Sequence, residues 1–596
     1  MAAGTVEDVT WDLEHLVDGE GPAGVDRLLE DATRRAETFA EQYAGRLAEI
    51  DGPGLVAAMD ELSEIHDLVG RAGHYAALRF SADMSDPANG ALMQRAEEHG
   101  TKIETRLLFF DLEWAALDDE RADALLATEG LERARHHLRT LRRYRPHLLS
   151  EPEEKILTEK AISGRNAWSR LFGELISTIE VDVPDAEAPV QLDAALSLLS
   201  KPDRDLRRGV AEGVTAALEP GLRTRAFIFN TLLHDKAVDD RLRSYPTWLS
   251  SRNLSNEASD ESVQALVEAV RGAYDIPQRW YRVKAGLLGI DKLADYDRMA
   301  PVTQEDEEVD WDEACDLVLG AYDAFSDDLG ALVRQFFDDH WIDAPIRPGK
   351  RPGAFCAYGT PTVHPYVLLN YASRRRDVLT LAHELGHGVH AALARPRGPL
   401  EMSTPLTLAE TASVFGETLV FGRLLERAPS PSSRLSLLAE SLEGSIATVF
   451  RQVAMNRFEN SCHTARREEG ELAPERIGEL WIAEQSELVG DAVELTDDYR
   501  MWWSYVPHFI STPGYVYAYA YGQLLALSVY ARYVEEGESF VPRYLELLSA
   551  GGSRSPEQLG EIVGIDLTDP GFWDRGLQIV RDQLEEAEQA AQAAAA

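Results

Sequence analysis

The sequence predicts a mainly α-helical protein with two or more lobes and a small β element. At 596 residues the chain is several times the size of a usual domain, so it can bury a large core. Apolar residues recur at helical spacing from about residue 24 to residue 175, and again over most of the chain after residue 199. Only two segments carry the pattern of strands.

The first strand-like segment covers residues 176–199. Its sequence STIEVDVPDAEAPVQLD alternates apolar and polar residues and contains two prolines, which predicts a short hairpin at a lobe boundary. The second segment covers residues 343–372. Aromatic and β-branched residues lie there between turn formers, which predicts one or two strands.

The lobe boundary is placed near residue 195. We therefore expect an N-terminal helical lobe at residues 1–195 and a second lobe, which carries the candidate chemistry, at residues 196–584. The remaining segment, residues 585–596, reads EEAEQAAQAAAA. Because this tail is low in complexity, we expect it to fray in solvent.

Charge and hydropathy exclude two classes of partner. The chain has 102 acidic and 59 basic residues and a formal net charge of -43, which argues against a surface that grips phosphate backbones or anionic lipid. No stretch reaches the ~18 uninterrupted apolar residues of a membrane span. We expect neither nucleic acid nor a membrane as a partner.

The expected compartment is the cytoplasm. Acidic residues stand at the N-terminus where a signal peptide needs a basic and then an apolar region. The three cysteines, Cys315, Cys356 and Cys462, are odd in number and far apart, which does not make a disulfide framework and fits a reducing compartment.

The main chemical signal is RRRDVLTLAHELGHGVHAALA, residues 374–394. Its apolar positions follow three- and four-residue steps, which predicts a helix buried on one side. His383 and His387 are four apart, so one helical turn aims both imidazoles at a common point, and Glu384 can reach a water there. This is the H-E-x-x-H arrangement of zinc peptidases. The alternative is a pair of histidines held by hydrogen bonds on a polar helix face.

A catalytic zinc needs three protein ligands and one open position. One peptidase group takes its third ligand from position 393, which is Leu here. The segment TLAETASVFGETLVF, residues 407–421, instead offers Glu410 and Glu417, seven apart on one face of the same predicted helix. We expect Glu410 to be the ligand. Glu417 either orients a ligand from behind or is an ordinary solvated or salt-bridged side chain.

His390 follows His387 by three residues and is an alternative metal ligand. Because two histidines and Glu410 already complete a set of three, we expect His390 to pack or to form hydrogen bonds. Two His and a carboxylate suit zinc, and cobalt or manganese can occupy the same kind of site.

At this point the chain resembles a known family. HELGH followed by LAETASVFGE, and preceded by GAFC and HPYVLLNY, is similar to oligoendopeptidase F of the thimet oligopeptidase family of zinc metallopeptidases. The likeness extends to WDLEHLV near the start, to DYDRMAPV at residues 295–302 and to HFISTPGYVYAYAYG at residues 508–522. It therefore covers most of the chain.

The resemblance implies a large helical fold of the zincin-like (gluzincin) class, in which a small β element lines a deep central channel that admits short unstructured peptides. His383, His387 and Glu410 fall on the ligands of one zinc ion, and Glu384 falls on the catalytic glutamate. The segment that contains Gly353 and Ala354 falls on the strand edge that pairs with the substrate backbone.

The late segment matches the family's substrate-contacting His and Tyr at His508 and Tyr515. Peptide hydrolysis builds negative charge on the former carbonyl oxygen, which neutral donors of this kind stabilise. Tyr519, one helical turn after Tyr515, would share its face. The thimet branch has a further Tyr at the position of Gly522 here, so Tyr519 or Tyr521 would take that role; Tyr517 and Tyr521 are expected to be core or wall residues.

These observations predict a zinc-dependent endopeptidase that cuts internal bonds of short oligopeptides, with Glu384 taking the proton of an activated water. The alternative within enzymes is an exopeptidase, a carboxypeptidase or dipeptidase on a similar scaffold. A non-catalytic peptide-binding or chaperone-like protein is the alternative outside enzymes, and the retained set of two His and two Glu argues against it.

Overall fold

The computed structural model describes residues 6–303 and 308–595. Helices make up 73% of it and the strands are few and short, which confirms the mainly α fold class. The chain forms two compact units, each assembled from three stretches of sequence: unit 1 comprises residues 1–145, 306–426 and 529–566, and unit 2 comprises residues 146–305, 427–528 and 567–596. Residue 195, the expected lobe boundary, lies inside unit 2. The division into residues 1–195, 196–584 and 585–596 stays a prediction.

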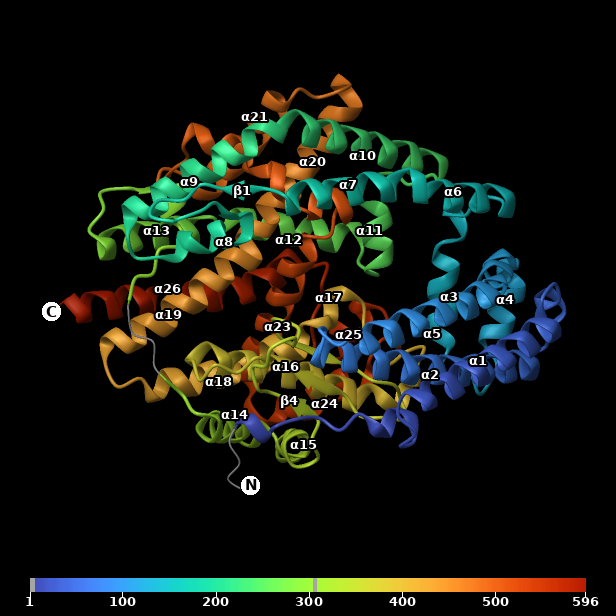
Figure 1. The fold of residues 1–596 in the computed structure, drawn as a ribbon. Helices are drawn as coiled ribbons and strands as arrows, with labels where there is room; N and C mark the ends of the chain where they lie inside the picture. The colour runs from blue at the N-terminus through green and yellow to red at the C-terminus, as the bar shows by residue number, and fades with distance from the viewer. Residues whose placement is uncertain (1–5, 304–307, 596) are drawn as a thin grey trace. The chain divides into compact units, whose positions relative to one another are not determined.

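Unit 1 begins with a bundle of three long helices that lie side by side (Figure 1). Asp51 caps the second of them by accepting a hydrogen bond from the Gly54 amide at 2.8 Å. The bundle's buried side chains join those of Val363 and Tyr366 in one core, so the strand that contains Tyr366 is anchored to the bundle. The helices of this unit are α1 Pro22–Tyr43, α2 Gly52–Ala82, α3 Pro87–Ala116, α4 Asp119–Leu126, α5 Arg135–Arg143, α14 Trp311–Phe325, α15 Asp327–Asp338, α16 Arg375–Ala394, α17 Leu406–Ala409, α18 Thr411–Arg427, α24 Val541–Ala550 and α25 Pro556–Ile562.

A three-stranded sheet in unit 1 supports the metal-motif helix α16, which packs against two of its strands. Its order is β4 (Ile342–Asp343), β6 (Tyr366–Leu368), β5 (Phe355–Ala357), with β6 parallel to β4 and antiparallel to β5. The sequence predicted one or two strands in this region, and the structure has three. The short β4 was missed because its pairing partner lies about 25 residues further along the chain.

Unit 2 is built around an aromatic core in which Phe229, Phe458, Trp481 and Phe509 lie in contact. Its β1 (Glu180–Val181) and β2 (Val190–Gln191) form the predicted antiparallel hairpin, and β3 (Leu293–Ala294) pairs in parallel with β7 (Val493–Glu494). The helices of this unit are α6 Glu151–Ser163, α7 Arg165–Ser177, α8 Leu192–Ser197, α9 Arg204–Leu218, α10 Leu222–Leu242, α11 Ser250–Ser255, α12 Asp260–Gly272, α13 Asp275–Leu288, α19 Pro431–Ser445, α20 Arg451–Glu469, α21 Pro474–Val489, α22 His508–Ser511 and α26 Pro570–Ala595. Helix α23, Tyr517–Glu536, begins in unit 2 and ends in unit 1.

The C-terminal tail was expected to fray, but its described part is helical. Residues 585–595 continue helix α26, which lies alongside α19 (Figure 1). Ala587 is fully buried, and Glu588 forms an ion pair with Arg279 at 2.9 Å. Alanine has the highest helix propensity and leaves room for close approach of a neighbouring helix, so a simple sequence still packs here.

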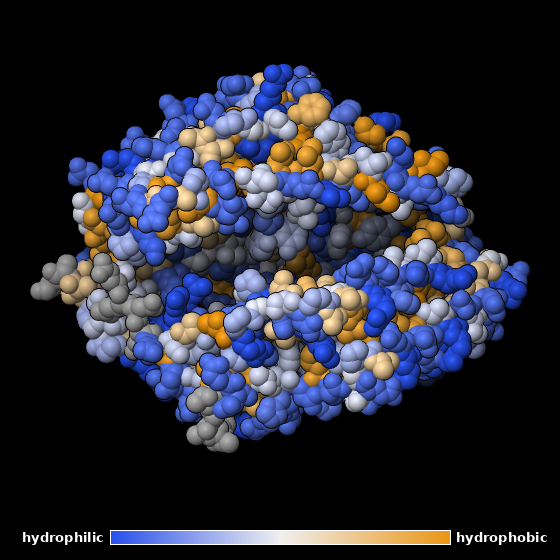
Figure 2. All heavy atoms as spheres, viewed as in Figure 1, coloured by the Kyte–Doolittle hydropathy of each residue, from blue (hydrophilic) through white to orange (hydrophobic). Residues whose placement is uncertain are grey.

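Hydrophilic residues cover most of the face seen in Figure 2, with apolar residues gathered only in small groups. Among the residues that the structure describes, no helix combines the length and the apolar character that crossing a membrane requires.

Candidate metal centre

Helix α16 presents the two motif histidines from a well-anchored position. Its first turn is capped by Asp377, whose Oδ2 accepts hydrogen bonds from the amides of Ala372 at 2.8 Å and Arg374 at 3.1 Å. Four members of the predicted apolar stripe are buried, Val378, Leu381, Leu385 and Val389, each at most 1% exposed. The fifth, Ala392, is partly exposed. Because one face of α16 is locked into the core, the orientation of its polar face is determined.

Gly386 allows α16 to approach the helix that carries the third candidate ligand. A Cβ atom at this position would lie 2.4 Å from the carbonyl oxygen of Ala412 and 2.6 Å from the backbone α-carbon of Ser413. Both are backbone atoms that cannot turn away, so a larger residue would push α16 and α18 apart.

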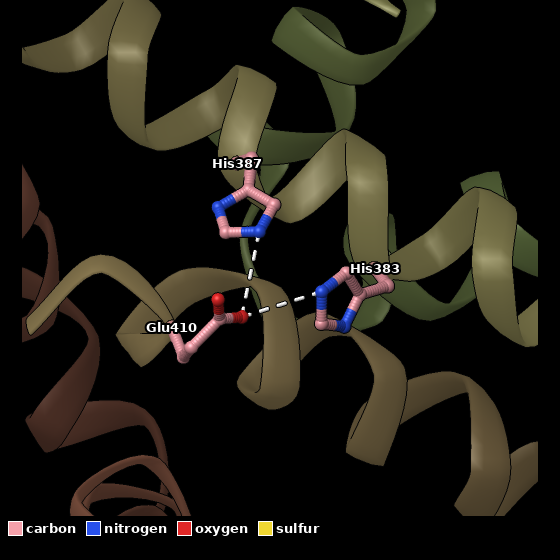
Figure 3. A group of neighbouring side chains, drawn as sticks. All are labelled: His383, His387 and Glu410. Carbon is pink, nitrogen blue, oxygen red and sulfur yellow. Dashed lines mark ion pairs between the residues drawn. The ribbon is translucent and has the colours of Figure 1, made fainter. Parts of the chain in front are cut away.

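The two histidines converge on one carboxylate oxygen. The Nε2 atoms of His383 and His387 lie 3.3 Å and 3.4 Å from Oε2 of Glu410 (Figure 3). Two ligands bound at about 2.05 Å in tetrahedral geometry lie about 3.3 Å apart, so these donors have the spacing that a zinc ion requires. The donor set, two imidazoles and one carboxylate, is also one that catalytic zinc uses. The residues present therefore fit the metal that the motif implies.

Glu410 does not lie within a continuous helix, as the sequence had predicted for residues 407–421. Helix α17 ends at Ala409, and α18 starts at Thr411. The Ser413 hydroxyl donates a hydrogen bond to Oε2 of Glu410 at 2.6 Å and also lies 3.2 Å from the carbonyl oxygen of Glu410. Breaking the helix at Glu410 frees this residue from helical geometry, and the bond from Ser413 orients its carboxylate.

A second layer of contacts lies behind each histidine. His383 Nδ1 is 3.1 Å from Oε2 of Glu417, and His387 Nδ1 is 3.5 Å from the hydroxyl of Tyr358. Glu417 was expected either to orient a ligand or to be an ordinary solvated side chain. In the structure it contacts His383, a candidate ligand. Tyr358, which directly follows β5, was missed because no spacing in the sequence links it to residue 387.

Charges within the group are strongly coupled. Burial lowers the pKa of His383, but hydrogen bonds to Glu410 and Glu417 outweigh this effect and raise it to about 10. Burial raises the pKa of Glu410, but the two histidines outweigh it and hold the pKa far below the usual range. The carboxylate is therefore ionised and available as a ligand over the whole physiological pH range.

Glu384 differs from Glu410 in its surroundings. It is 7% exposed, and burial raises its pKa, an effect that His383 and His387 partly oppose. A carboxylate with a raised pKa is a better proton acceptor near neutral pH than a solvated one. Cys356 on β5 is free, and burial together with the Glu384 charge raises the pKa of its thiol well above 9, so this cysteine stays protonated.

His390 does not join the metal-binding group. It is 3% exposed and borders a small cavity that Leu408 and Leu547 also line. Burial lowers its pKa to about 4, so the ring is neutral at physiological pH. Its position agrees with the expected packing role.

Gly353 and Ala354 lie just before β5, one of the two edge strands of the sheet. Gly353 has φ = 85°, a backbone conformation that favours glycine, and its carbonyl oxygen accepts a hydrogen bond from the Asn370 side chain at 2.8 Å. Within the described residues β5 pairs only with β6, so no strand pairs with its other edge.

The late His and Tyr residues form their own cluster in unit 2. The hydroxyl of Tyr519 lies 3.4 Å from Nε2 of His508, and the Tyr515 ring lies 5.1 Å from that of Tyr519. Burial lowers the pKa of His508, with Arg451 acting in the same direction, so this ring is neutral at pH 7.

Tyr517 and Tyr521 point instead into the core, as expected. The Tyr517 hydroxyl accepts a hydrogen bond from Asn256 at 2.9 Å, and the Tyr521 hydroxyl donates to Ser262 at 3.3 Å. Both rings are fully buried. Of the tyrosines considered for the late cluster, Tyr519 is therefore the one placed beside His508 and Tyr515.

The same architecture and motifs occur in known proteins. The family model described as peptidase family M3 matches residues 322–579, which include the whole metal group, and that of oligopeptidase F matches residues 113–180. Together they cover more than half of the chain. The chain belongs to peptidase family M3. The chain is accordingly a peptidase of the oligoendopeptidase F type.

Relatives match this M3 peptidase over nearly its whole length. Oligopeptidase PepF of Bacillus subtilis is 26% identical and covers 92% of this chain, with 82% of its own length matched. The group B oligopeptidase PepB of Streptococcus agalactiae is 25% identical, with 86% of each chain covered. An oligoendopeptidase F homologue of Lactococcus lactis is 24% identical and covers 98% of this chain and 97% of its own.

Solved structures show the same fold. A peptidase structure from Chlamydophila abortus superimposes with a TM-score of 0.87 at 22% identity and covers 98% of this chain and 99% of its own. Oligoendopeptidase F from Enterococcus faecium has a TM-score of 0.72 at 22% identity, with coverage of 95% and 98%.

Proposed function

We propose that this M3 peptidase is a zinc-dependent endopeptidase that hydrolyses internal bonds of short oligopeptides. The observation that carries the proposal is the convergence of His383 and His387 on one oxygen of Glu410, with the buried Glu384 on the same helix. One zinc ion would be held by His383, His387 and Glu410. When bound there, it supplies Lewis acidity, which lowers the pKa of a water and polarises the substrate carbonyl.

Glu384 is the proposed proton carrier. Its raised pKa lets the carboxylate accept a proton from the attacking water and then release it to the leaving nitrogen, so no side-chain nucleophile is needed. Glu417 and Tyr358 hold the two histidines so that both Nε2 atoms face Glu410.

The unit 2 cluster is the proposed stabiliser of the developing oxyanion. His508 is neutral at pH 7, and Tyr515 and Tyr519 carry hydroxyl donors, so all three can donate hydrogen bonds to a negative oxygen without adding a charge to the site. Tyr521 is excluded from this role because its hydroxyl is committed to Ser262 in the core.

Short peptides are the proposed substrates. The edge of β5 with which no described strand pairs, together with Gly353 and Ala354, is suited to pair with an extended backbone, and several relatives are named oligopeptidases. A folded protein would have to unfold, at a cost of about 5–15 kcal/mol, before its backbone could pair in this way. The free cysteines support a reducing compartment, so we place the enzyme in the cytoplasm.

Two variants test the mechanism. Glu384→Gln should lower kcat by at least about 100-fold and leave one zinc per chain, because the base is lost and the ligands remain. Glu410→Ala should lose both metal and activity, since two imidazoles make a weak site. Activity of Glu384→Gln within about tenfold of the wild type would refute the role of Glu384. One tightly bound zinc in Glu410→Ala would place the third ligand elsewhere.

A digest tests the substrate class. A flexible peptide of roughly ten residues and the same sequence held inside a stable folded domain are incubated with the enzyme and followed by mass spectrometry. We expect internal cleavage of the free peptide and survival of the folded form. Stepwise removal of residues from one end would support an exopeptidase, and equal cleavage of both substrates would refute the restriction to short peptides.

A further inference from the structure

A buried carboxyl group on α20 holds the turn that precedes Tyr515. Glu459 is 1% exposed, and its Oε1 accepts a hydrogen bond from the backbone amide of Gly514 at 2.9 Å. Neither residue belongs to the metal group or to the three side chains proposed to stabilise the oxyanion. Both lie in unit 2, together with His508, Tyr515 and Tyr519.

The turn itself favours glycine at its centre. Gly514 has φ = 72°, and a Cβ atom there would lie 2.6 Å from Cδ1 of Leu249. The next residue, Tyr515, donates its amide hydrogen to the carbonyl oxygen of Thr512 at 3.1 Å. The backbone between α22 and α23 is therefore bent sharply, with the Gly514 amide directed into the core.

Arg252 on α11 holds the same turn from another direction. Its Nε donates to the carbonyl oxygen of Pro513 at 3.4 Å, and its guanidinium lies 6.0 Å from the centre of the Tyr515 ring. The Tyr515 ring in turn lies 6.0 Å from that of His508 and 5.1 Å from that of Tyr519. A displacement of the turn would thus be transmitted directly to the cluster.

We propose that Glu459 is a positioning residue that sets the geometry of the His508, Tyr515 and Tyr519 cluster through the Gly514 amide. This inference rests on the oxyanion role proposed for that cluster. A buried amide without an acceptor is unfavourable, so loss of the Glu459 oxygen would favour rearrangement of the turn. Burial raises the pKa of Glu459 to about 8, an effect that the Gly514 bond and Arg252 partly oppose. A protonated carboxyl still presents an acceptor oxygen to the amide.

The test compares two substitutions of similar shape. Glu459→Gln keeps an acceptor oxygen, whereas Glu459→Met fills the same space without one. Val453→Ala, at a fully buried position on the same helix, is the control for general destabilisation. Glu459→Ala replaces Glu459→Met if the latter does not accumulate as folded protein. The zinc content, kcat, KM and hydrogen exchange of the peptide covering residues 511–516 are measured for each.

We expect Glu459→Met to lower kcat by about 10- to 100-fold with KM within about threefold, because the donors are displaced and not removed. Exchange in residues 511–516 should rise in this variant alone, and zinc content should stay at one per chain. In Glu459→Gln, both kcat and the exchange rate of residues 511–516 should equal the wild-type values. Val453→Ala should lower thermal stability without changing kcat. The variant that combines Glu459→Met with Tyr519→Phe should lower kcat by less than the product of the two single fold-changes, since both substitutions act on the same cluster.

Unchanged exchange in Glu459→Met would overturn the anchoring. If Glu459→Met shows faster exchange but a wild-type kcat, while Tyr519→Phe and His508→Ala have a lowered kcat, the positioning role is overturned. The proposed function then still stands. Wild-type kcat in both Tyr519→Phe and His508→Ala would instead refute the oxyanion role of the cluster.

Discussion

The imidazole of His383 is held between two carboxylates, with Nε2 3.3 Å from Glu410 and Nδ1 3.1 Å from Glu417. The two contacts determine which nitrogen faces the metal position, because the nitrogen occupied by Glu417 cannot also bind a metal. A carboxylate behind a histidine ligand also makes the ligand more basic. We therefore expect Glu417 to contribute to metal affinity without being a ligand.

We predict that Glu417→Gln weakens zinc binding by about 10- to 100-fold, since the amide keeps an acceptor oxygen but loses the charge. Competition with a chelator measures the affinity. Glu426→Gln, an exposed position on the same helix, is the matched control and should bind zinc as the wild type does. Equal affinity of the two variants would show that Glu417 is only a solvated side chain.

Tyr358 stands behind His387 as Glu417 stands behind His383, but its contact is longer and uncharged. The distance from its hydroxyl to Nδ1 is 3.5 Å, at the limit of a hydrogen bond. Tyr358→Phe should therefore weaken zinc binding by less than about tenfold. The same chelator competition measures it, and a larger loss than in Glu417→Gln would reverse the order of importance derived from these contacts.

Tyr519 and Tyr521, two residues apart on α23, should respond differently to loss of the hydroxyl group. Tyr519→Phe should lower kcat by about 100-fold at unchanged thermal stability, because it removes a proposed oxyanion donor. Tyr521→Phe removes a buried bond to Ser262 and should cost about 1 kcal/mol of stability with little effect on kcat. Peptide hydrolysis and thermal unfolding of both variants check the assignment, which fails if the two effects are exchanged.

The buried Glu459 predicts a pH dependence of stability. Its pKa in the folded protein is about 8, above the usual 4.5, so the folded state keeps a proton that the unfolded chain releases between these values. The stabilisation is complete below pH 4.5 and is lost as the pH rises to about 8. Between pH 5.5 and 8.5 the wild type should lose roughly 3 kcal/mol relative to Glu459→Gln, which cannot ionise.

Urea unfolding of both proteins at the two pH values measures this difference. Glu468→Gln, on the exposed end of α20, should instead track the wild type at both pH values. A difference between Glu459→Gln and the wild type that does not change with pH would show that Glu459 is already ionised in the folded protein at pH 5.5.

Local pattern was enough to predict much of this protein. The apolar stripe of residues 378–392 identified α16, and the four-residue spacing of His383 and His387 placed both rings on one helical face. The alternation around residue 180 identified the hairpin. Each of these features depends on neighbours within a few turns of chain, and helical and strand periodicity act over that range.

Tertiary structure decided the features that join distant parts of the chain. The break at Glu410, the approach of α18 to Gly386 and the contact of Tyr358 with His387 all depend on packing between separate elements. Composition also misjudged the first part of the tail, where Ala587 and Ala590 are buried because α26 packs against a helix about 140 residues earlier. Sequence periodicity specifies which face of an element is apolar, but not which partner covers it, because that choice depends on the shapes of both surfaces.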